Sequence, residues 1–360
     1  VGDTAFSRSR GFYEAPFALE ISSDTAGAEI YYTTDGSVPS ETNGQLYVGP
    51  ITVSTTTTLR AIATQSGFRP SNVDSQTYLF LEDVLTVFLT NRECPFHCLM
   101  CDLWQNTADQ RVPVGAVPEQ IRHALKSLPP AQHIKLYNSG NFFDAPAIPP
   151  EDFSAIAERG DGFKSVIVEN HPRLCSERCV EFQELCGAQL EIAMGLETSH
   201  EPTLATLNKQ MTLDDFTTAC EFLLRHQIRL RTFILLRPPG TSENEGIRRA
   251  NESVRFAFDS GVDCCAVIPT RTGNGIMERL EREGRFVPPQ LTSLEAVLQE
   301  TVAWKRGRVF ADLWDVRQFA TCEACADARI QRLSEINLTQ QLPPPIECKS
   351  CGTSSEGRRD

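Results

Sequence analysis

The sequence lacks any apolar run approaching the ~18 residues that a membrane-spanning helix requires. Its first residues, Val-Gly-Asp-Thr-Ala-Phe-Ser-Arg, show no basic segment followed by an apolar stretch, so no signal peptide is visible. Basic residues are also few: 34 Lys and Arg against 47 Asp and Glu give a net charge of −13. This balance argues against broad attraction to nucleic-acid phosphate, though not against a local basic groove or an RNA-binding partner. We expect a cytoplasmic protein without a membrane segment.

Cysteine and tryptophan are missing from the first 80 residues, although the chain holds 13 Cys. Short β-type runs with turn signals such as Asn43-Gly44 predict a small β-sandwich here. The runs are 17–21, 28–33, 46–48 and 58–63. Residues 28–40 together with 58–63 resemble the immunoglobulin-like domain at the carboxyl end of chitobiases and β-hexosaminidases. The resemblance implies a spacer or interaction module; a sugar-binding site is the alternative, because fold alone does not confer function.

From residue 85 onward the pattern alternates between strand and helix. The expected strands are 85–90, 133–137, 164–168, 190–195, 229–236 and 263–268. The expected helices between them include 118–128, 151–159, 176–186, 213–226 and 243–260. Six such repeats indicate a parallel sheet, and six are too few to close an eight-stranded barrel. We predict an α/β fold, a partial (βα)6 barrel, preceded by the small all-β sandwich.

Cys94, Cys98 and Cys101 are spaced C-x3-C-x2-C on one loop, directly after the expected strand 85–90. Three thiolates can hold three irons of a 4Fe–4S cluster and leave the fourth open to a substrate. The motif resembles that of the radical S-adenosylmethionine (SAM) enzymes. The resemblance implies that the open iron binds SAM, and that an electron from the cluster cleaves the sulfonium bond to give a 5′-deoxyadenosyl radical. It also implies a reductant protein such as flavodoxin or ferredoxin.

Ligands of parallel α/β proteins gather at the carboxyl ends of the strands. Ser139-Gly140 matches the segment that holds the SAM amino group in the radical SAM family, with Asn141 replacing the usual acidic residue; a plain Asn/Gly turn is the alternative. Glu197 is the predicted hydrogen-bond acceptor for the SAM ribose or amine, and Ser199 is a lesser candidate.

Three further positions are candidate SAM contacts. Arg237 would be costly to bury without an anionic partner, so the SAM carboxylate is predicted there; Glu169 or Glu197 is the alternative. Met100 and Ile268 are expected to pack on the adenine.

Two residues near the predicted site are assigned no SAM contact. Glu169 is assigned either to the substrate or to an ion pair. His97, inside the cysteine loop, is expected to be exposed rather than to bind iron.

Segments such as Leu136-Tyr-Asn-Ser-Gly-Asn-Phe and Val168-Glu-Asn-His-Pro resemble one branch of this family: the radical SAM subunit of archaeosine synthase, related to the catalytic subunit of Elongator. The match extends over most of residues 85–351. It implies a lyase or oxidoreductase type of reaction, cleavage of a C–N bond in a modified tRNA nucleoside, and a tRNA-binding partner subunit. The alternatives are an iron–sulfur electron-transfer or binding protein without SAM chemistry, and an extracytoplasmic interaction protein defined by its first domain.

Cys322, Cys325, Cys348 and Cys351 form two C-x2-C pairs near the end of the chain. Two such pairs favour a tetrahedral structural zinc site; a second iron–sulfur cluster and a redox-active dithiol are the alternatives. The other six cysteines are expected to be ordinary buried thiols. The predicted segments are 1–82 for the β-sandwich, 85–275 for the barrel and 276–360 for an extension that carries these four cysteines.

Overall fold

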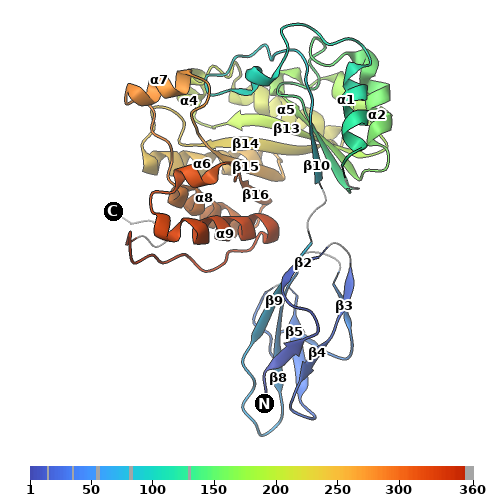
Figure 1. The fold of residues 1–360 in the computed structure, drawn as a ribbon, viewed down its shortest axis with the longest axis vertical. Coiled ribbons are helices and arrows are strands. Elements are labelled where there is room, and N and C mark those ends of the chain that lie inside the picture. The colour runs from blue at the N-terminus through green and yellow to red at the C-terminus, as the bar shows by residue number, and fades with distance from the viewer. Residues whose placement is uncertain (14–15, 35, 54–56, 81–83, 129–130, 353–360) are drawn as a thin grey trace. The chain divides into compact units, whose positions relative to one another are not determined.

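The computed structural model describes residues 1–13, 16–34, 36–53, 57–80, 84–128 and 131–352 (Figure 1). The chain divides into two compact units, Val1–Glu82 and Asp83–Asp360, which are described separately. The predicted boundary between the first two segments falls on residues 81–83, and the predicted third segment ends in residues 353–360; both stretches lie outside the described residues. The three-segment division stays a prediction.

The first unit consists of short strands. They are β1 (Thr4–Phe6), β2 (Gly11–Tyr13), β3 (Phe17–Leu19), β4 (Ile21–Ser23), β5 (Glu29–Thr33), β6 (Gln45–Leu46), β7 (Ile51–Val53), β8 (Thr57–Thr64) and β9 (Asp74–Phe80). A five-stranded sheet in the order β2-β9-β8-β5-β6 is accompanied by the two-stranded sheets β1-β4 and β3-β7. All pairs are antiparallel except β2 with β9. Alternate residues of β8, Leu59, Ala61 and Ala63, are fully buried, as the period of a half-buried strand requires.

The predicted all-β class of this unit is confirmed, with one correction to its strands. The run 17–21, expected as one strand, is two: β3 pairs with β7 and β4 pairs with β1. The chain therefore changes sheets at Glu20, and no turn residue marks this position in the sequence.

The second unit is a parallel seven-stranded sheet with the strands in chain order. The strands are β10 (Val84–Phe88), β11 (His133–Tyr137), β12 (Ser165–Asn170), β13 (Gln189–Glu197), β14 (Arg229–Leu236), β15 (Cys264–Pro269) and β16 (Arg308–Ala311). All neighbouring strands are parallel, and β10 and β16 form the two edges of the sheet within the described part of the chain. The predicted partial barrel is confirmed. All six predicted strands are present, and β16 extends the sheet by one more.

Helices connect these strands. They are α1 (Ala116–Leu125), α2 (Phe153–Gly160), α3 (Glu177–Leu185), α4 (Glu201–Thr206), α5 (Leu213–Arg225), α6 (Glu243–Asp259), α7 (Ile276–Arg282), α8 (Leu291–Ala303) and α9 (Glu323–Thr339). Short 3-10 turns are η1 (Leu103–Asn106), η2 (Pro150–Asp152), η3 (Pro172–Leu174) and η4 (Val316–Phe319). A Thr212–Asp215 capping box begins α5, because its two side chains satisfy backbone N–H groups that the first turn leaves free.

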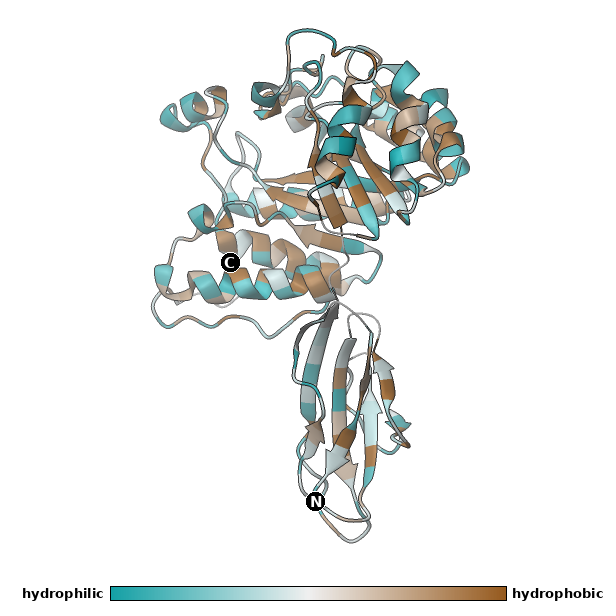
Figure 2. Ribbon diagram, turned by 45° about the vertical axis from the view of Figure 1, so that its right-hand side comes forward, coloured by the Kyte–Doolittle hydropathy of each residue, from teal (hydrophilic) through white to brown (hydrophobic). Residues whose placement is uncertain are grey.

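The two faces of this sheet differ in character. Residues such as Leu136, Val168 and Ile192 are fully buried and belong to one core shared with the helices. Figure 2 shows the sheet largely in brown, whereas the helices carry both colours, as expected for helices with one buried face. The alternate positions form the opposite face, here called the inner face; it carries polar residues such as Lys135 and Glu169.

Candidate functional site

The loop after β10 carries the three cysteines of the predicted cluster. Cys94, Cys98 and Cys101 are all half-buried. Burial raises the pKa of each thiol, that of Cys98 to about 11, whereas the Lys209 ammonium lowers all three. Cys94 and Cys101 also raise the pKa of Cys98. The three sulfurs therefore share one neighbourhood with a buried cation.

The segment that follows α4 holds this loop from one side. Asn208 Nδ2 donates a hydrogen bond to the carbonyl oxygen of His97 (2.9 Å), and Gln210 Nε2 donates to that of Phe96 (2.6 Å). Both residues adopt positive φ angles of 53° and 55°, a conformation that costs a non-glycine residue free energy. The cysteine loop thus has its backbone positioned by protein contacts alone. His97 itself is exposed, as expected, and its Nδ1 lies 3.3 Å from a Glu93 carboxylate oxygen.

The ring of His171 stacks on Phe96 of the cysteine loop. The rings of Phe96 and His171 have centroids 3.6 Å apart and are almost parallel. His171 Nε2 lies 2.9 Å from the carbonyl oxygen of Lys209, and its Nδ1 accepts the backbone N–H of Arg173. Because burial disfavours the imidazolium, the pKa of His171 falls to about 3. His171 is therefore a neutral ring that donates from Nε2.

The predicted Ser139-Gly140 segment lies beside Cys94. Ser139 has a φ of 52°, and a Cβ at Gly140 would lie 3.6 Å from the Cys94 Cβ. Asn141 Nδ2 lies 3.1 Å from the Cys94 sulfur, and its Oδ1 accepts the backbone N–H of His171 at 2.7 Å. Asn141 therefore connects the cysteine loop to β12, instead of offering the free carboxylate that its counterpart has in the radical SAM family. SAM contact at Ser139 and Gly140 stays a prediction.

Glu197 forms a buried ion pair that we did not predict. Its Oε1 lies 2.7 Å from Lys209 Nζ, and the two side chains are only 8% and 10% exposed. A β-bulge between Gly195 and Glu197 and a φ of 64° turn the Glu197 side chain toward Lys209. A Cβ at Gly195 would overlap the ends of both charged side chains, so a larger residue there would displace the ion pair. The predicted SAM contact of Glu197 is untested.

The remaining candidates have other contacts. Arg237 forms an ion pair with Glu243 at the start of α6 and donates to the carbonyl oxygen of Pro288 (2.8 Å). The expected alternative partners, Glu169 or Glu197, were therefore wrong. The Ser199 hydroxyl lies 3.2 Å from that of Ser253 on α6.

The two predicted adenine contacts are apolar. Met100 packs with Leu99 against Met277, Leu280 and Phe286. Ile268 is half-buried on β15. A SAM contact of either side chain stays a prediction.

Glu169 occupies the inner face near the carboxyl end of β12. Within the described part of the chain its carboxylate makes no hydrogen bond or ion pair, although Lys135 and Lys209 act on it electrostatically. Burial raises its pKa to about 7. The alternative of an ion pair for Glu169 is thus not realised, and the substrate role stays a prediction.

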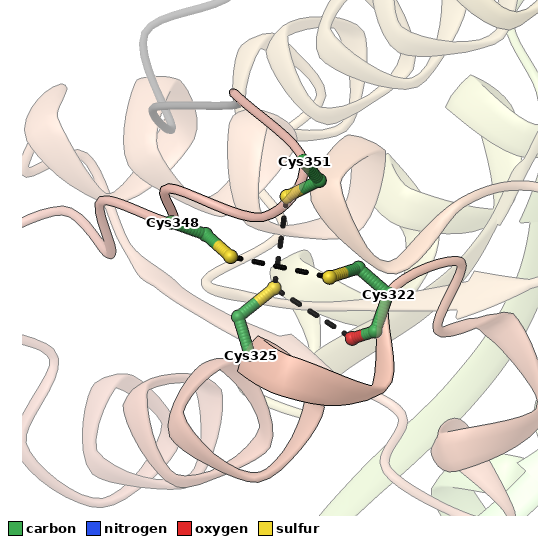
Figure 3. A group of neighbouring side chains, drawn as sticks. All are labelled: Cys322, Cys325, Cys348 and Cys351. Atoms are coloured by element: carbon green, nitrogen blue, oxygen red, sulfur yellow. Dashed lines mark hydrogen bonds between the residues drawn. The ribbon is translucent and has the colours of Figure 1, made fainter.

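The four cysteines near the end of the chain form a compact group. Figure 3 shows their sulfurs pointing toward one another: Cys322 to Cys348 and Cys325 to Cys351 are each separated by 3.9 Å. All four sulfurs lie within 4.8 Å of one another, so the group can hold a metal ion. A disulfide is excluded at these distances, because its sulfurs lie about 2.05 Å apart. Backbone N–H groups lower the pKa of Cys348, which favours its thiolate.

Buried charges lie directly behind this group. Arg329 Nε donates to the Cys325 sulfur at 3.2 Å, and the same guanidinium pairs with Glu295. Glu295 also pairs with Arg332 at 3.3 Å. All three side chains are at most 2% exposed. Two buried cations and one anion leave an excess positive charge beside the four sulfurs, which suits a group of thiolates.

Of the six other cysteines, Cys179, Cys186, Cys220, Cys264 and Cys265 are buried, as expected, and Cys175 is half-buried. Among the described residues, no helix is both long enough and apolar enough to cross a bilayer.

Comparison with known proteins adds two findings. Residues 9–75 match the family model described as the Chitobiase/beta-hexosaminidase C-terminal domain. The archaeosine synthase subunit beta of Methanosarcina acetivorans is 26% identical over 235 residues, covering 61% of this chain and 67% of that protein. The subunit of the same name from Thermococcus kodakarensis is 27% identical over 212 residues, covering 56% and 65%.

Among solved structures, the archaeal Methanocaldococcus infernus Elp3 aligns with a TM-score of 0.47 at 14% identity, covering 71% of this chain and 64% of that one. The chain spans about two thirds of the length of the curated relatives it matches. The two resemblances predicted from the sequence are thus confirmed: the first unit resembles the Chitobiase/beta-hexosaminidase C-terminal domain, and the larger part of the chain resembles the archaeosine synthase subunit beta.

Proposed function

We propose that this chain is a radical SAM enzyme that cleaves SAM reductively at a 4Fe–4S cluster held by Cys94, Cys98 and Cys101. The observation that carries the proposal is the preformed cysteine loop at the carboxyl edge of an open parallel sheet. The similarity to archaeosine synthase subunit beta supports it. When bound, the cluster supplies the electron for the cleavage of SAM.

The residues present fit such a cluster. Three half-buried thiols come from one loop whose carbonyl oxygens already have hydrogen-bond donors in Asn208 and Gln210. These hydrogen bonds order the backbone of the loop during folding, which favours binding because part of the ordering cost is then already met. A buried cation, Lys209, lies among the thiols, where it offsets negative charge.

The chain's own side chains would orient SAM. We propose that Ser139 and Gly140 contact its amino group, and that Glu197 accepts a hydrogen bond through Oε2 while Lys209 holds Oε1. Ser199 is a proposed additional contact. Met100 and Ile268 are proposed contacts of the adenine. Arg237 is a proposed contact of the SAM carboxylate, made while its guanidinium keeps its pair with Glu243.

The substrate is proposed by analogy with the proteins named archaeosine synthase subunit beta. We propose that this chain acts on a modified nucleoside of tRNA and cleaves a C–N bond in it. A second subunit would bind the tRNA, because the net charge of −13 gives this chain little attraction of its own for phosphate. A flavodoxin or ferredoxin would deliver the electron.

We further propose that the four cysteines near the end of the chain hold a structural zinc ion. Tetrahedral zinc–sulfur bonds of about 2.3 Å place the sulfurs about 3.8 Å apart. The observed 3.9 Å separations match this value. A cubane cluster would hold its cysteine sulfurs farther apart, because each binds a different iron. The first unit is proposed to be a spacer or interaction module.

One experiment tests the enzymatic proposal. The full chain is reconstituted anaerobically with iron and sulfide, then mixed with SAM and dithionite, and 5′-deoxyadenosine is measured by chromatography. We expect turnover by the native chain and none by Cys98→Ala, which should also lose the brown absorbance near ~400 nm. Cys186→Ala, at a buried thiol outside both metal sites, is the matched control. No 5′-deoxyadenosine from a fully loaded native chain would instead indicate a cluster protein without SAM chemistry.

A further inference from the structure

An ion pair between Lys209 and Glu197 lies at the base of the cysteine loop. Lys209 Nζ and Glu197 Oε1 are 2.7 Å apart, and each side chain is about nine-tenths buried. Salt screens charges in such positions poorly, since counterions cannot approach them. The field of each charge is therefore weakened mainly by its partner and little by salt.

Three hydrogen bonds hold the backbone around Lys209 in place beside the loop. Its two neighbours, Asn208 and Gln210, donate to carbonyl oxygens between Cys94 and Cys98. Its own carbonyl oxygen lies 2.9 Å from Nε2 of His171, whose ring stacks on Phe96 of the loop. These contacts fix the position of the Lys209 charge relative to the cysteines.

The same segment also contacts the loop on the other side of Cys98. The backbone N–H of Leu99, between Cys98 and Cys101, donates to the carbonyl oxygen of Leu207 at 2.8 Å. Residues 207–210 are therefore fixed against the loop before and after Cys98, and Lys209 holds Glu197 there through its ion pair. A buried cation and a buried anion thus lie beside the proposed cluster.

We propose that Lys209 raises and Glu197 lowers the one-electron reduction potential of the cluster, so that the pair holds the potential between the values that either charge alone would give. The inference rests on the proposed function. Reduction transfers one electron from the reductant to the cluster and so adds one unit of negative charge there. A fixed cation stabilises that added charge and a fixed anion opposes it, which is how nearby charge tunes such clusters. Lys209 would act through the cluster and is therefore a positioning residue.

The test is a redox titration of the full reconstituted chain without SAM, followed by electron paramagnetic resonance. The Lys209→Met variant keeps the length of the side chain and removes its charge, so its midpoint potential should become more negative. Glu197→Gln should make the potential less negative. The double variant, which keeps the shape of the pair without its charges, should return close to the native value. Lys209→Arg, which keeps the charge, should also stay close to it.

Lys126→Met is the matched control, because Lys126 is exposed beyond the end of α1. It should leave the potential unchanged. If Lys209→Met and Glu197→Gln shift the potential in the same direction, or neither shifts it in a chain with full iron content, the inference is wrong. Should Lys209→Met fail to retain iron, Glu197→Gln decides the sign: a potential that is unchanged or more negative in this variant would refute the inference. A native chain that binds no cluster would refute the proposed function itself, which separates the two failures.

Discussion

Glu295 offers the sharpest test of the energetics, because it is the only carboxylate that pairs with Arg329 and Arg332 among the described residues. Its side chain is fully buried, and those of the two arginines are 2% exposed. The variant Glu295→Gln keeps the size of the side chain but removes the buried carboxylate that both guanidinium groups share. Breaking a buried pair in this way costs about 3–5 kcal/mol. For a unit of this size, about 2 °C per kcal/mol predicts a fall in Tm of roughly 6–10 °C.

Tryptophan fluorescence can measure this loss in the full chain. All three tryptophans, Trp104, Trp304 and Trp314, lie in the second unit, so their emission reports its unfolding in urea without a contribution from the first. Glu281→Gln is the matched control, since Glu281 is exposed on α7 of the same unit, and it should change the free energy of unfolding by less than about 0.5 kcal/mol. A Glu295→Gln variant as stable as this control would refute the reasoning. It would show that the carbonyl oxygens of Pro343 and Ile346 and the cysteine sulfur suffice to stabilise the arginines.

Three further predictions concern the metal, the pH dependence and the nucleic acid. Cys348→Ser should lose one zinc per chain and thermal stability while retaining four irons, measured by elemental analysis and calorimetry; eight irons and no zinc in the native chain would contradict the zinc proposal. Burial lowers the pKa of His171 to about 3, so the stability conferred by its neutral ring should be complete above about pH 6.5 and fall by at most ~1.4 kcal/mol per unit as the pH drops toward 3. His171→Phe should show a shallower acid-side loss in urea titrations, and an unchanged slope would count against a neutral buried His171. The chain alone should bind bulk tRNA weakly and with little salt dependence in filter binding; tight binding that falls steeply with salt would overturn this.

The sequence predicts features that depend on neighbouring residues better than features that depend on contacts between distant segments of the chain. The six long strands and five of the helices were predictable, because their apolar periodicity is local. Strand β16 has only four residues, too few to show a period, and it is recognised only through its pairing with β15. The spacing of the cysteines along the chain predicts both groups of candidate metal ligands, the C-x3-C-x2-C loop and the two C-x2-C pairs. The sequence does not predict the Lys209–Glu197 pair, because Lys209 lies after α4 and not at a strand end.

Charge pairing was the least predictable part of the site. Arg237 at the end of β14 suggested a partner at a neighbouring strand end, yet its carboxylate comes from Glu243, six positions later on α6. A φ of 56° at Arg237 turns the chain back toward that helix. Backbone turns of this kind decide which charges meet, and the residue types alone do not specify them.

The pairing of β16 with β15 bears on how the chain can be shortened. A polypeptide ending near residue 275 would lose β16, α8 and α9 together, and β15 would become the new edge of the sheet. That strand reads Cys264-Cys-Ala-Val-Ile-Pro269, with unpaired backbone groups and little charge to discourage pairing with other chains. Such a truncated barrel should form aggregates that grow by strand addition. The carboxyl-terminal segment is therefore expected to protect the sheet from self-association by covering β15, independently of its four cysteines.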